Sequence, residues 1–381
     1  MRVGVLRSDV PAQSGGAFTF EQELFEQLLR SAGESAHQFV ILDAPARLHD
    51  PAAPANVSFA AAPPEPLHRL LRRLRRFRFD GIVADAGVEV IWNLAAGHPV
   101  TDTPFITPVW DLQHRLQPLF PEVSAGGEWL QRERYFSHRL QRSAALIAGT
   151  EAGRREISMF YQIPPQRIHV LPHPTPRFAL EAGADRPGVL HRFKLPERYL
   201  FYPAQFWPHK NHANLLHALA LLREQGTRLP LVLTGADKGN ASFVRALVRK
   251  LGLDRQVHIL GFVSVEELVA LYRGALGLAY LSLFGPENLP PLEAFALGCP
   301  VVAAEVSGAR EQLGDAALLV DGTKPPLIAE ALRRLSDDAA LRAQLIARGS
   351  EGARRFTGKD FVRGVFGILD GLAPFLRCWR E

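Results

Sequence analysis

The hydrophobic positions of this chain fall into short apolar runs that alternate with segments of helical periodicity. Six runs in the first half predict strands: VGVL (3–6), QFVIL (38–42), GIVADA (81–86), PFITPV (104–109), AALIAG (144–149) and IHVL (168–171). Helical patterns lie between several of them, from Thr19 to about Ala32, over 67–79, from Glu128 to about Arg142 and from Thr150 to about Tyr161. Strands that alternate with helices are typical of a parallel sheet with helices on both faces.

The same alternation restarts after the segment 171–188, which is rich in Pro and Gly. Strands are expected at 199–204, 231–236, 257–263, 278–283 and 317–320, and helices from Asn214, from Ala241 and after Ser264, which forms a capping box with Glu267. Three helices follow, the last with Thr357 as a plausible N-cap. We therefore predict an α/β protein of two doubly wound, Rossmann-like domains that face a cleft, 1–175 and 191–357, with a linker at 176–190 and a C-terminal helix within 358–381.

Composition narrows the class of protein. Apolar residues make up 47% and charged residues 22% of the 381 positions, which is typical of a globular chain. No run approaches the roughly 18 apolar residues of a membrane span, and the sequence MRVGVLRSDV lacks the apolar segment of a signal peptide. The two cysteines, Cys299 and Cys378, indicate neither a disulfide framework nor a metal pair. We expect a cytoplasmic protein without a metal.

One segment accounts for the net charge of +5. The stretch LHRLLRRLRRFRF (67–79) holds six arginines and no acid, and removing those six from the 44 basic residues leaves 38 against 39 acidic residues. Its apolar residues recur at helical spacing, with the arginines largely off that stripe. The segment is either a surface helix that covers a sheet or a patch for an anionic membrane surface, formed by Arg69, Arg72, Arg73 and Arg76. No aromatic stacking platform accompanies the arginines, so nucleic acid is not expected as a partner.

The stretch LAYLSLFGPENLPPLEAFALGCPVV (278–302) places two carboxylates, Glu287 and Glu293, in an otherwise apolar strand–turn–helix unit. In a parallel sheet, the turn lies at the carboxyl end of the strand and therefore at the cleft. The helix start favours an anion such as a diphosphate. Glu293, expected in the first turn, could accept hydrogen bonds from a sugar diol, although the alternative is a carboxylate that only stabilises its own helix.

A second loop at a strand end carries Lys210, which could neutralise a diphosphate. Together, YPAQFWPHKNH (202–212) and FGPENLPPLEAFALGCPVV (284–302) resemble the second domain of glycosyltransferase family 4, the glycosyl transferases group 1. The resemblance implies the GT-B fold and the transfer, with retention of configuration, of a sugar from a nucleotide-diphosphate donor to a hydroxyl acceptor. A glycan or a lipid-linked saccharide is the expected acceptor, and the implied reaction needs no metal cofactor.

The resemblance also implies the site residues. Lys210 would contact the donor diphosphate, and Gln205 stands where many members have an arginine. Glu293 would bind the ribose hydroxyls, whereas the first glutamate of the family pattern is replaced by Gly285. The remaining donor contacts are expected at Gly15, Gly16, Phe262, Val263, Glu287, Asn288 and Leu289, and Asp111 and His114 are candidates beside the reacting sugar.

Two other functions fit parts of this pattern. A nucleotide-sugar epimerase or hydrolase would share the fold and the diphosphate site. A non-enzymatic basic protein would explain the arginine-rich segment but not the set of Lys210, Glu293 and the Gly15–Gly16 pair.

Overall fold

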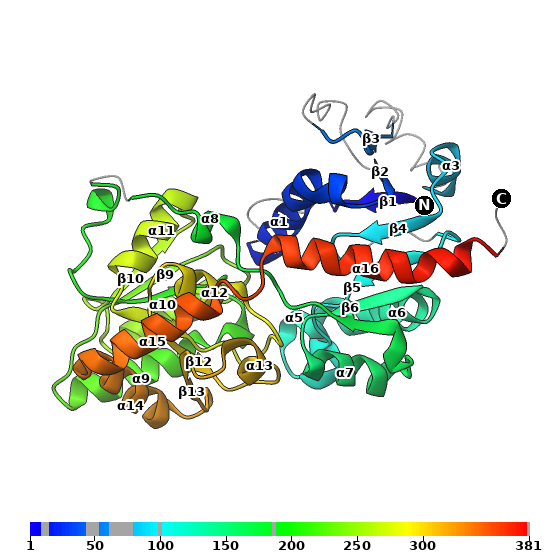
Figure 1. The fold of residues 1–381 in the computed structure, drawn as a ribbon. Coiled ribbons are helices and arrows are strands. Elements are labelled where there is room, and N and C mark those ends of the chain that lie inside the picture. The colour runs from blue at the N-terminus through cyan, green and yellow to red at the C-terminus, as the bar shows by residue number, and fades with distance from the viewer. Residues whose placement is uncertain (9–14, 43–52, 61–78, 98–100, 185–187, 379–381) are drawn as a thin grey trace.

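The computed structural model describes residues 1–8, 15–42, 53–60, 79–97, 101–184 and 188–378, and within these ranges it has two parallel β-sheets in two α/β domains (Figure 1). The arginine-rich helix expected at 67–79, with Arg69, Arg72, Arg73 and Arg76, falls outside these ranges except for Phe79. No helix in the described ranges combines the length and the apolar character needed to cross a bilayer. The predicted pair of doubly wound domains is confirmed.

The first sheet has the strand order β3-β2-β1-β4-β5-β6-β7, and all of its pairs are parallel. Several of its strands are buried along their whole length, which explains why they read as continuous apolar runs. The strands are β1 (Arg2–Leu6), β2 (Gln38–Ile41), β3 (Val57–Phe59), β4 (Val90–Asn93), β5 (Phe105–Pro108), β6 (Ala145–Ala148) and β7 (Ile168–Val170). The helices around it are α1 (Gly16–Ser31), α3 (Phe79–Asp85), α4 (Gln113–Leu116), α5 (Pro121–Ser124), α6 (Glu128–Arg142) and α7 (Glu151–Tyr161), with 3-10 turns at Ala32–Glu34, Ala125–Gly127 and Pro165–Arg167.

One predicted strand of this domain is wrong. Residues 81–85 of this run belong to helix α3, in which Val83 is buried and packs with Val88 and Ile91, and the strand follows at 90–93. Phe79 and Val83 stand four residues apart on one helix face, so the run is half-buried rather than enclosed as a central strand would be. The short strand β3 was not predicted.

The second sheet has the order β10-β9-β8-β11-β12-β13, again all parallel. Its strands are β8 (Leu200–Pro203), β9 (Leu231–Thr234), β10 (Val257–Gly261), β11 (Gly277–Tyr280), β12 (Val301–Ala304) and β13 (Ala317–Val320). Its helices are α8 (Arg177–Leu180), α9 (His212–Glu224), α10 (Ala241–Lys250), α11 (Val265–Gly274), α12 (Leu289–Ala296), α13 (Ala309–Leu313), α14 (Pro325–Asp337) and α15 (Ala339–Gly352), with 3-10 turns at His191–Phe193 and Pro208–Lys210. The predicted capping box of Ser264 and Glu267 opens α11.

The last helix, α16 (Gly358–Leu376), lies along the first domain and packs against α1 (Figure 1). Phe361 meets Phe20 with ring centroids 5.5 Å apart, and Phe366 meets Phe39 at 5.4 Å. Thr357 and Asp360 form a capping box at its start. The chain therefore crosses between the domains twice, before α8 and again before α16.

Candidate active site

Both sheets reverse their strand order at a central strand, and the two loops that leave these strands face each other. The order turns at β1, which lies between β2 and β4, and at β8, which lies between β9 and β11. Ligands of open α/β sheets bind at such switch points, beyond the carboxyl ends of the strands. Here the loop after β1 leads to Gly15 and Gly16, and the loop after β8 carries Gln205 and Lys210. All four residues line one cavity of about 480 Å³.

Nearly all of the predicted site residues meet in this cavity. From the first domain it is lined by Gly15, Gly16 and Asp111, and from the second by Gln205, Lys210, Phe262, Val263, Glu287, Asn288, Leu289 and Glu293. These residues come from loops that are far apart in the sequence, so their convergence is a property of the fold. His114 does not line the cavity.

Lys210 is held by its surroundings with its ammonium group at the cavity. Its Nζ donates hydrogen bonds to Tyr280 Oη at 3.1 Å and to Ser282 Oγ at 3.3 Å. Its backbone oxygen accepts from the buried Tyr202 hydroxyl at 2.6 Å. The next residue, Asn211, has a φ of 58° and donates to the backbone oxygen of Leu281 at 3.0 Å. The neutral partners fix the position of the cation without cancelling its charge, which suits a residue that binds an anion.

Glu293 points into the same cavity from α12. The helix begins at Leu289, so Glu293 lies in its second turn and the predicted place in the first turn is wrong. Its carboxylate accepts a hydrogen bond from the Tyr272 hydroxyl at 2.7 Å, and burial raises its pKa to about 7. Pro290 and Pro291 have no backbone N–H, so the first turn of α12 offers few hydrogen-bond donors to an anion. Of its first three residues, only Leu289 carries a backbone N–H. Gly298 follows the helix end with a φ of 70°.

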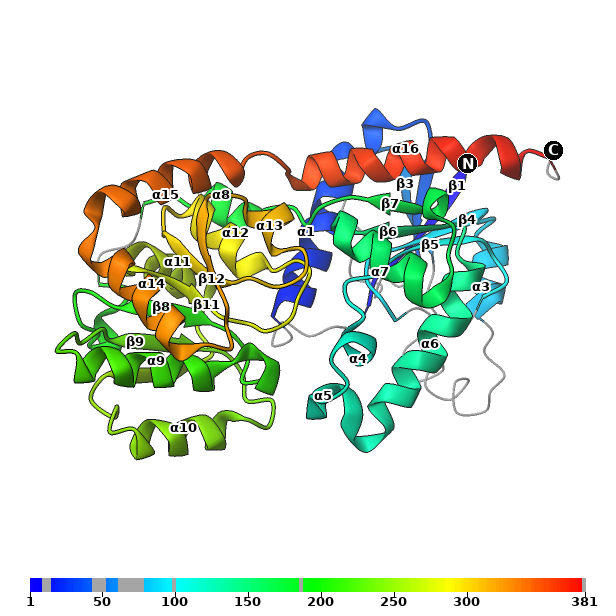
Figure 2. The ribbon, with the colours of Figure 1, turned by 90° about the horizontal axis from the view of Figure 1, so that it is seen from below.

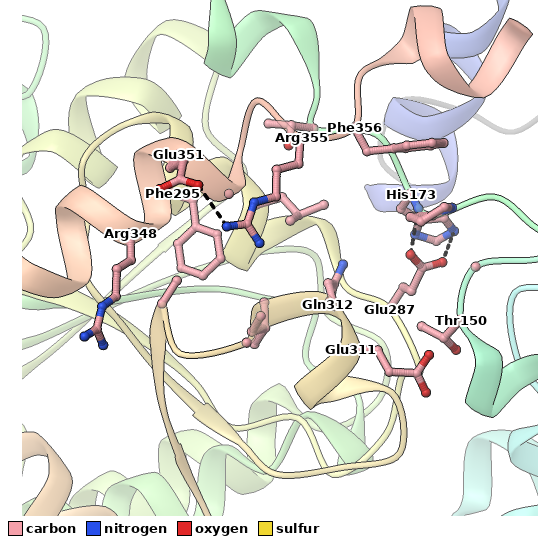
Figure 3. A pocket seen from close by; sticks show the side chains of 18 of the residues that line it. Thr150, His173, Glu287, Phe295, Glu311, Gln312, Arg348, Glu351, Arg355 and Phe356 are labelled. Carbon is pink, nitrogen blue, oxygen red and sulfur yellow. Dashed lines mark hydrogen bonds and ion pairs between the residues drawn. The ribbon is translucent and has the colours of Figure 1, made fainter.

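Glu287 is enclosed between the domains rather than directed at open solvent (Figure 3). Its Oε1 accepts the backbone N–H of His173 at 2.6 Å, and Oε2 lies 3.5 Å from His173 Nε2. A Cβ at Gly149 would lie 1.1 Å from Oε2, so the carboxyl group occupies the place that any side chain at 149 would take. Burial raises the pKa of Glu287 to about 8.

Glu287 and His173 also separate the main cavity from a second one. This neighbour has a volume of about 430 Å³ and lies where the domains join (Figure 3). Glu311 lines it and accepts the backbone N–H groups of Glu151 and Ala152 at the start of α7, at 2.6 and 2.9 Å. Arg355 of this cavity is paired with Glu351 at 3.0 Å. Of the charged groups in this cavity, Glu311 joins the two domains, whereas Arg355 and Glu351 pair within the second domain.

The Gly15–Gly16 loop brings the backbone of the first domain up to side chains of the second. Gly15 has a φ of 67°, which favours glycine, and it precedes the first residue of α1. A Cβ on Gly15 would lie 3.6 Å from Gln205 Nε2, and one on Gly16 would lie 3.7 Å from Leu289 Cδ1. A side chain here would fill the narrow part of the cavity.

The two residues predicted beside the reacting sugar lie in different surroundings. Asp111 lines the cavity, where it accepts the backbone N–H of Gln113 at 2.9 Å and pairs with Arg132. His114 is fully buried in the first domain, with Nε2 3.0 Å from the Tyr161 hydroxyl. Burial lowers the pKa of His114 to about 4. The expectation that His114 reaches the cleft is wrong, because the short helix α4 turns its ring inward toward Phe136, whose centroid is 5.3 Å away.

Two histidines of the cavity were missed by sequence reasoning. His173 lies after β7, and His209 directly precedes Lys210. The neighbouring lysine in WPHKNH could have drawn attention to His209, whereas nothing in the sequence marks His173. The described residues contain no group of three or more His, Cys, Asp or Glu side chains placed to hold a metal ion.

The end of the cavity beyond β9 and β10 is lined by backbone and apolar groups. Gly235, Ala236, Val263 and Leu268 form it, and Phe262 stands at its rim with 64% of its surface exposed. An apolar slot with backbone groups suits a heteroaromatic ring.

Comparisons with known proteins agree with this geometry. Residues 191–352 match the family described as "Glycosyl transferases group 1". The chain is 30% identical over 237 residues to the O-antigen chain mannosyltransferase B of Escherichia coli, covering 60% of this chain and 61% of that protein. It is 32% identical over 241 residues to the D-inositol 3-phosphate glycosyltransferase of Acidothermus cellulolyticus, covering 60% and 53%. The chain thus spans little more than half the length of these relatives.

Solved structures extend the likeness to the whole chain. The sucrose-phosphate synthase of Thermosynechococcus elongatus superposes with a TM-score of 0.74 at 18% identity, covering 98% of this chain and all of that one. Anabaena HepE in complex with UDP-glucose superposes with a TM-score of 0.68 at 17% identity and the same coverage. The molecule therefore has the GT-B fold, and the sequence of its second domain is similar to the glycosyl transferases group 1.

Proposed function

We propose that this protein is a retaining glycosyltransferase that moves a sugar from a nucleotide-diphosphate donor to a hydroxyl group of a glycan or lipid-linked acceptor. The observation that carries the proposal is the convergence of Lys210 and Glu293 with the Gly15–Gly16 backbone in one cavity between the domains. The names of the relatives, a mannosyltransferase and an inositol phosphate glycosyltransferase, support the same reaction class. The bound UDP-glucose of HepE supports a nucleotide sugar as the donor.

The donor would lie along the second domain. Its base would enter the apolar slot at Phe262 and Val263, its ribose hydroxyls would meet Glu293, and its diphosphate would meet Lys210 and the Gly15–Gly16 backbone. Gln205 would contact the phosphates as a neutral side chain. The sugar would then lie near Asn288 and Leu289, with Asp111 of the first domain on its other side. Both oxygens of Glu287 face His173 and Gly149, so Glu287 would act on the sugar through the shape of its loop.

The chemical work of this site is electrostatic. When the glycosyl–phosphate bond breaks, negative charge develops on the departing diphosphate, and Lys210 would stabilise that charge. The acceptor hydroxyl would attack from the same face and pass its proton to the departing phosphate. Contact between the domains would keep water away from the reacting carbon. The reaction needs no metal in this scheme, which activity measured in excess EDTA would test.

The acceptor and the place of action follow from the same proposal. A lipid-linked acceptor would be met in the cytoplasm at the inner face of the membrane, and the arginine-rich segment 67–79 would supply a patch for anionic lipid. Sedimentation with anionic and with neutral vesicles would test this, since binding only to the anionic vesicles is expected.

Ligand binding tests the donor site directly. Thermal unfolding with UDP, GDP, ADP, CMP and TDP should show one nucleoside diphosphate that raises the unfolding temperature, because a ligand of the folded state stabilises it. Lys210→Ala should weaken binding of that nucleotide about ten- to hundredfold, since charge-assisted hydrogen bonds contribute about 1.5–3 kcal/mol. Lys250→Ala, an exposed lysine at the end of α10, is the matched control. If no nucleotide binds, or if both variants behave alike, the proposal is wrong.

Turnover of the donor separates a transferase from its rivals. A transferase should consume the donor quickly only when an acceptor is present, and the product should keep the anomeric configuration. Rapid loss of the donor in the absence of any acceptor would instead identify a hydrolase or an epimerase.

A further inference from the structure

A carboxylate of the first domain reaches the loop that carries Lys210. Glu122, in α5, accepts two hydrogen bonds from His209: its Oε1 lies 3.1 Å from the backbone N and 2.5 Å from Nδ1. Both side chains are enclosed, with 5% of Glu122 and 13% of His209 exposed. Gln117 donates to the backbone oxygen of Leu283 at 2.8 Å beside them, so this segment of the first domain touches the second at two points. Figure 2 shows α4 and α5 on the side of the first domain that faces the second.

The contact with Glu122 fixes which ring nitrogen of His209 a ligand can use. An ionised carboxylate only accepts hydrogen bonds, so Nδ1 carries the hydrogen in this pair. His209 lines the main cavity beside Lys210, and no hydrogen bond of Nε2 is found among the described residues. Nε2 is therefore the atom that His209 offers to the cavity.

The charges around the cavity leave room for a second cation. Among the described residues that line it, Lys210 is the one lysine or arginine, whereas a bound diphosphate brings two or more negative charges. Glu122 carries its charge in an enclosed place, and its Oε2 has no hydrogen-bond partner in the described part of the chain. A proton on His209 would satisfy both anions, because Glu122 lies at Nδ1 and a phosphate would lie at Nε2.

Without a ligand the surroundings of His209 favour the neutral ring. Burial is the largest influence and lowers the pKa of His209; the hydrogen bond to Glu122 raises it, Lys210 lowers it, and the charge of Asp111 raises it. His212, stacked on Tyr202 and Phe206, is also close enough to act on it. A phosphate beside Nε2 would add a negative charge, which would raise the pKa of His209 and favour the protonated ring.

We propose that His209 is a donor-binding residue that becomes the second cation of the site when the diphosphate binds, and that Glu122 is the positioning residue that holds its ring. This inference rests on the proposed function. One proton from solvent binds to Nε2 and stays there, so that Nε2–H donates a hydrogen bond to a phosphate oxygen. Nδ1–H continues to donate its hydrogen bond to Glu122. Since Glu122 belongs to the first domain, the cation is complete only when the two domains meet.

Proton uptake on binding tests the proposal. UDP, GDP, ADP and inorganic diphosphate would be titrated calorimetrically in buffers of different ionisation enthalpy at pH 7.5, which counts the protons taken up per ligand. The wild type should take up a substantial fraction of a proton, and its affinity should rise about tenfold from pH 8.5 to pH 6.5. His209→Gln keeps a hydrogen-bonding side chain but cannot take up the proton, so its affinity should change less than about threefold over this range.

Glu122→Gln provides the second and more specific variant. This variant leaves His209 in place and keeps an oxygen that can accept the backbone N–H of His209. If Glu122 had only a structural role, the pH profile of binding would not change. The proposal expects the variant to take up fewer protons on binding. His217→Gln, an exposed histidine of α9, is the matched control. Asp111, Glu287 and Glu293 also face the cavity and remain in every variant, so the difference from wild type isolates His209.

The outcomes distinguish this inference from the function on which it rests. If the wild type binds none of the nucleotides, both fail. If it binds one of them and both variants keep the wild-type proton uptake and pH profile, the role of His209 is refuted and the donor site stands. Loss of proton uptake in both folded variants, but not in the control, supports the second cation.

Discussion

Replacing Glu287 by glutamine should make the stability of this protein less sensitive to pH. The side chain of Glu287 is enclosed where the two domains join, and its carboxyl group has the backbone N–H of His173 as its hydrogen-bond donor. Burial disfavours the ionised form and raises the pKa from its ordinary value of 4.5 to about 8, with a smaller contribution of the same sign from Glu311. At neutral pH the group is therefore protonated in the folded protein, and glutamine is a close substitute for it in shape and charge.

The size of the effect follows from the pKa difference between the folded and unfolded chains. Below a pH of about 4.5 the group is protonated in both states, and between about 5 and 8 only the folded protein keeps the proton. The free energy of unfolding therefore falls as the pH rises through this window. The full shift corresponds to at most roughly 4–5 kcal/mol, of which about 2–3 kcal/mol would be lost between pH 5 and pH 7.

Denaturant unfolding of wild type and Glu287→Gln at pH 5, 6, 7 and 8 would measure this difference. We expect the glutamine variant to gain stability relative to wild type as the pH rises. Glu224→Gln, at an exposed position at the end of α9, should give a curve parallel to that of the wild type. A constant offset between wild type and Glu287→Gln across the whole range would refute the reasoning, because it would mean that Glu287 has the same pKa in both states.

Four further outcomes are expected. Gly149→Ala should lower the free energy of unfolding by about 1–3 kcal/mol in denaturant unfolding, because the new methyl group displaces the Glu287 carboxyl from its hydrogen bond. Gly33→Ala, at a position with open space around it, should not show this loss. Glu293→Gln should lower turnover about tenfold, and the wild-type kcat/KM should rise with pH to a plateau above the pKa of about 7, while the variant stays flat. His114→Gln should lower the unfolding temperature but leave nucleotide affinity within about twofold in calorimetry, since this ring lies outside the cavity. Excess EDTA should leave the initial rate unchanged, and a loss restored by added Mg²⁺ would contradict the metal-free scheme.

The sequence predicted the cavity well where one general rule applied. Parallel strands end at the same edge of a sheet, so residues directly after a strand can be assigned to the cleft without knowledge of their contacts. Lys210 after β8 and Glu293 after β11 were found in this way, whereas the Gly15–Gly16 pair after β1 was predicted from the family resemblance, and all line the cavity.

The predictions failed where they depended on the direction of a side chain or on a contact between residues far apart in the sequence. His114 follows β5 like Asp111, but one turn of helix rotates it into the first domain, and no pattern in the sequence reports that rotation. The contact between Glu122 and His209 joins residues 87 positions apart on different domains, so neither residue indicates the other. The run 81–86 shows the limit of short apolar segments, which fit a strand and a helix face equally well.

The packing of α16 on α1 has a consequence for folding during synthesis on the ribosome. The apolar face of α1, with Phe20 among its buried residues, is covered by Phe361 and its neighbours, which are synthesised after the whole of the second domain. The first domain thus cannot finish folding before the second has been translated, unlike most chains, whose domains fold in order as they emerge. A fragment that stops at residue 175 should accordingly aggregate, and supplying residues 353–381 as a separate peptide should rescue it.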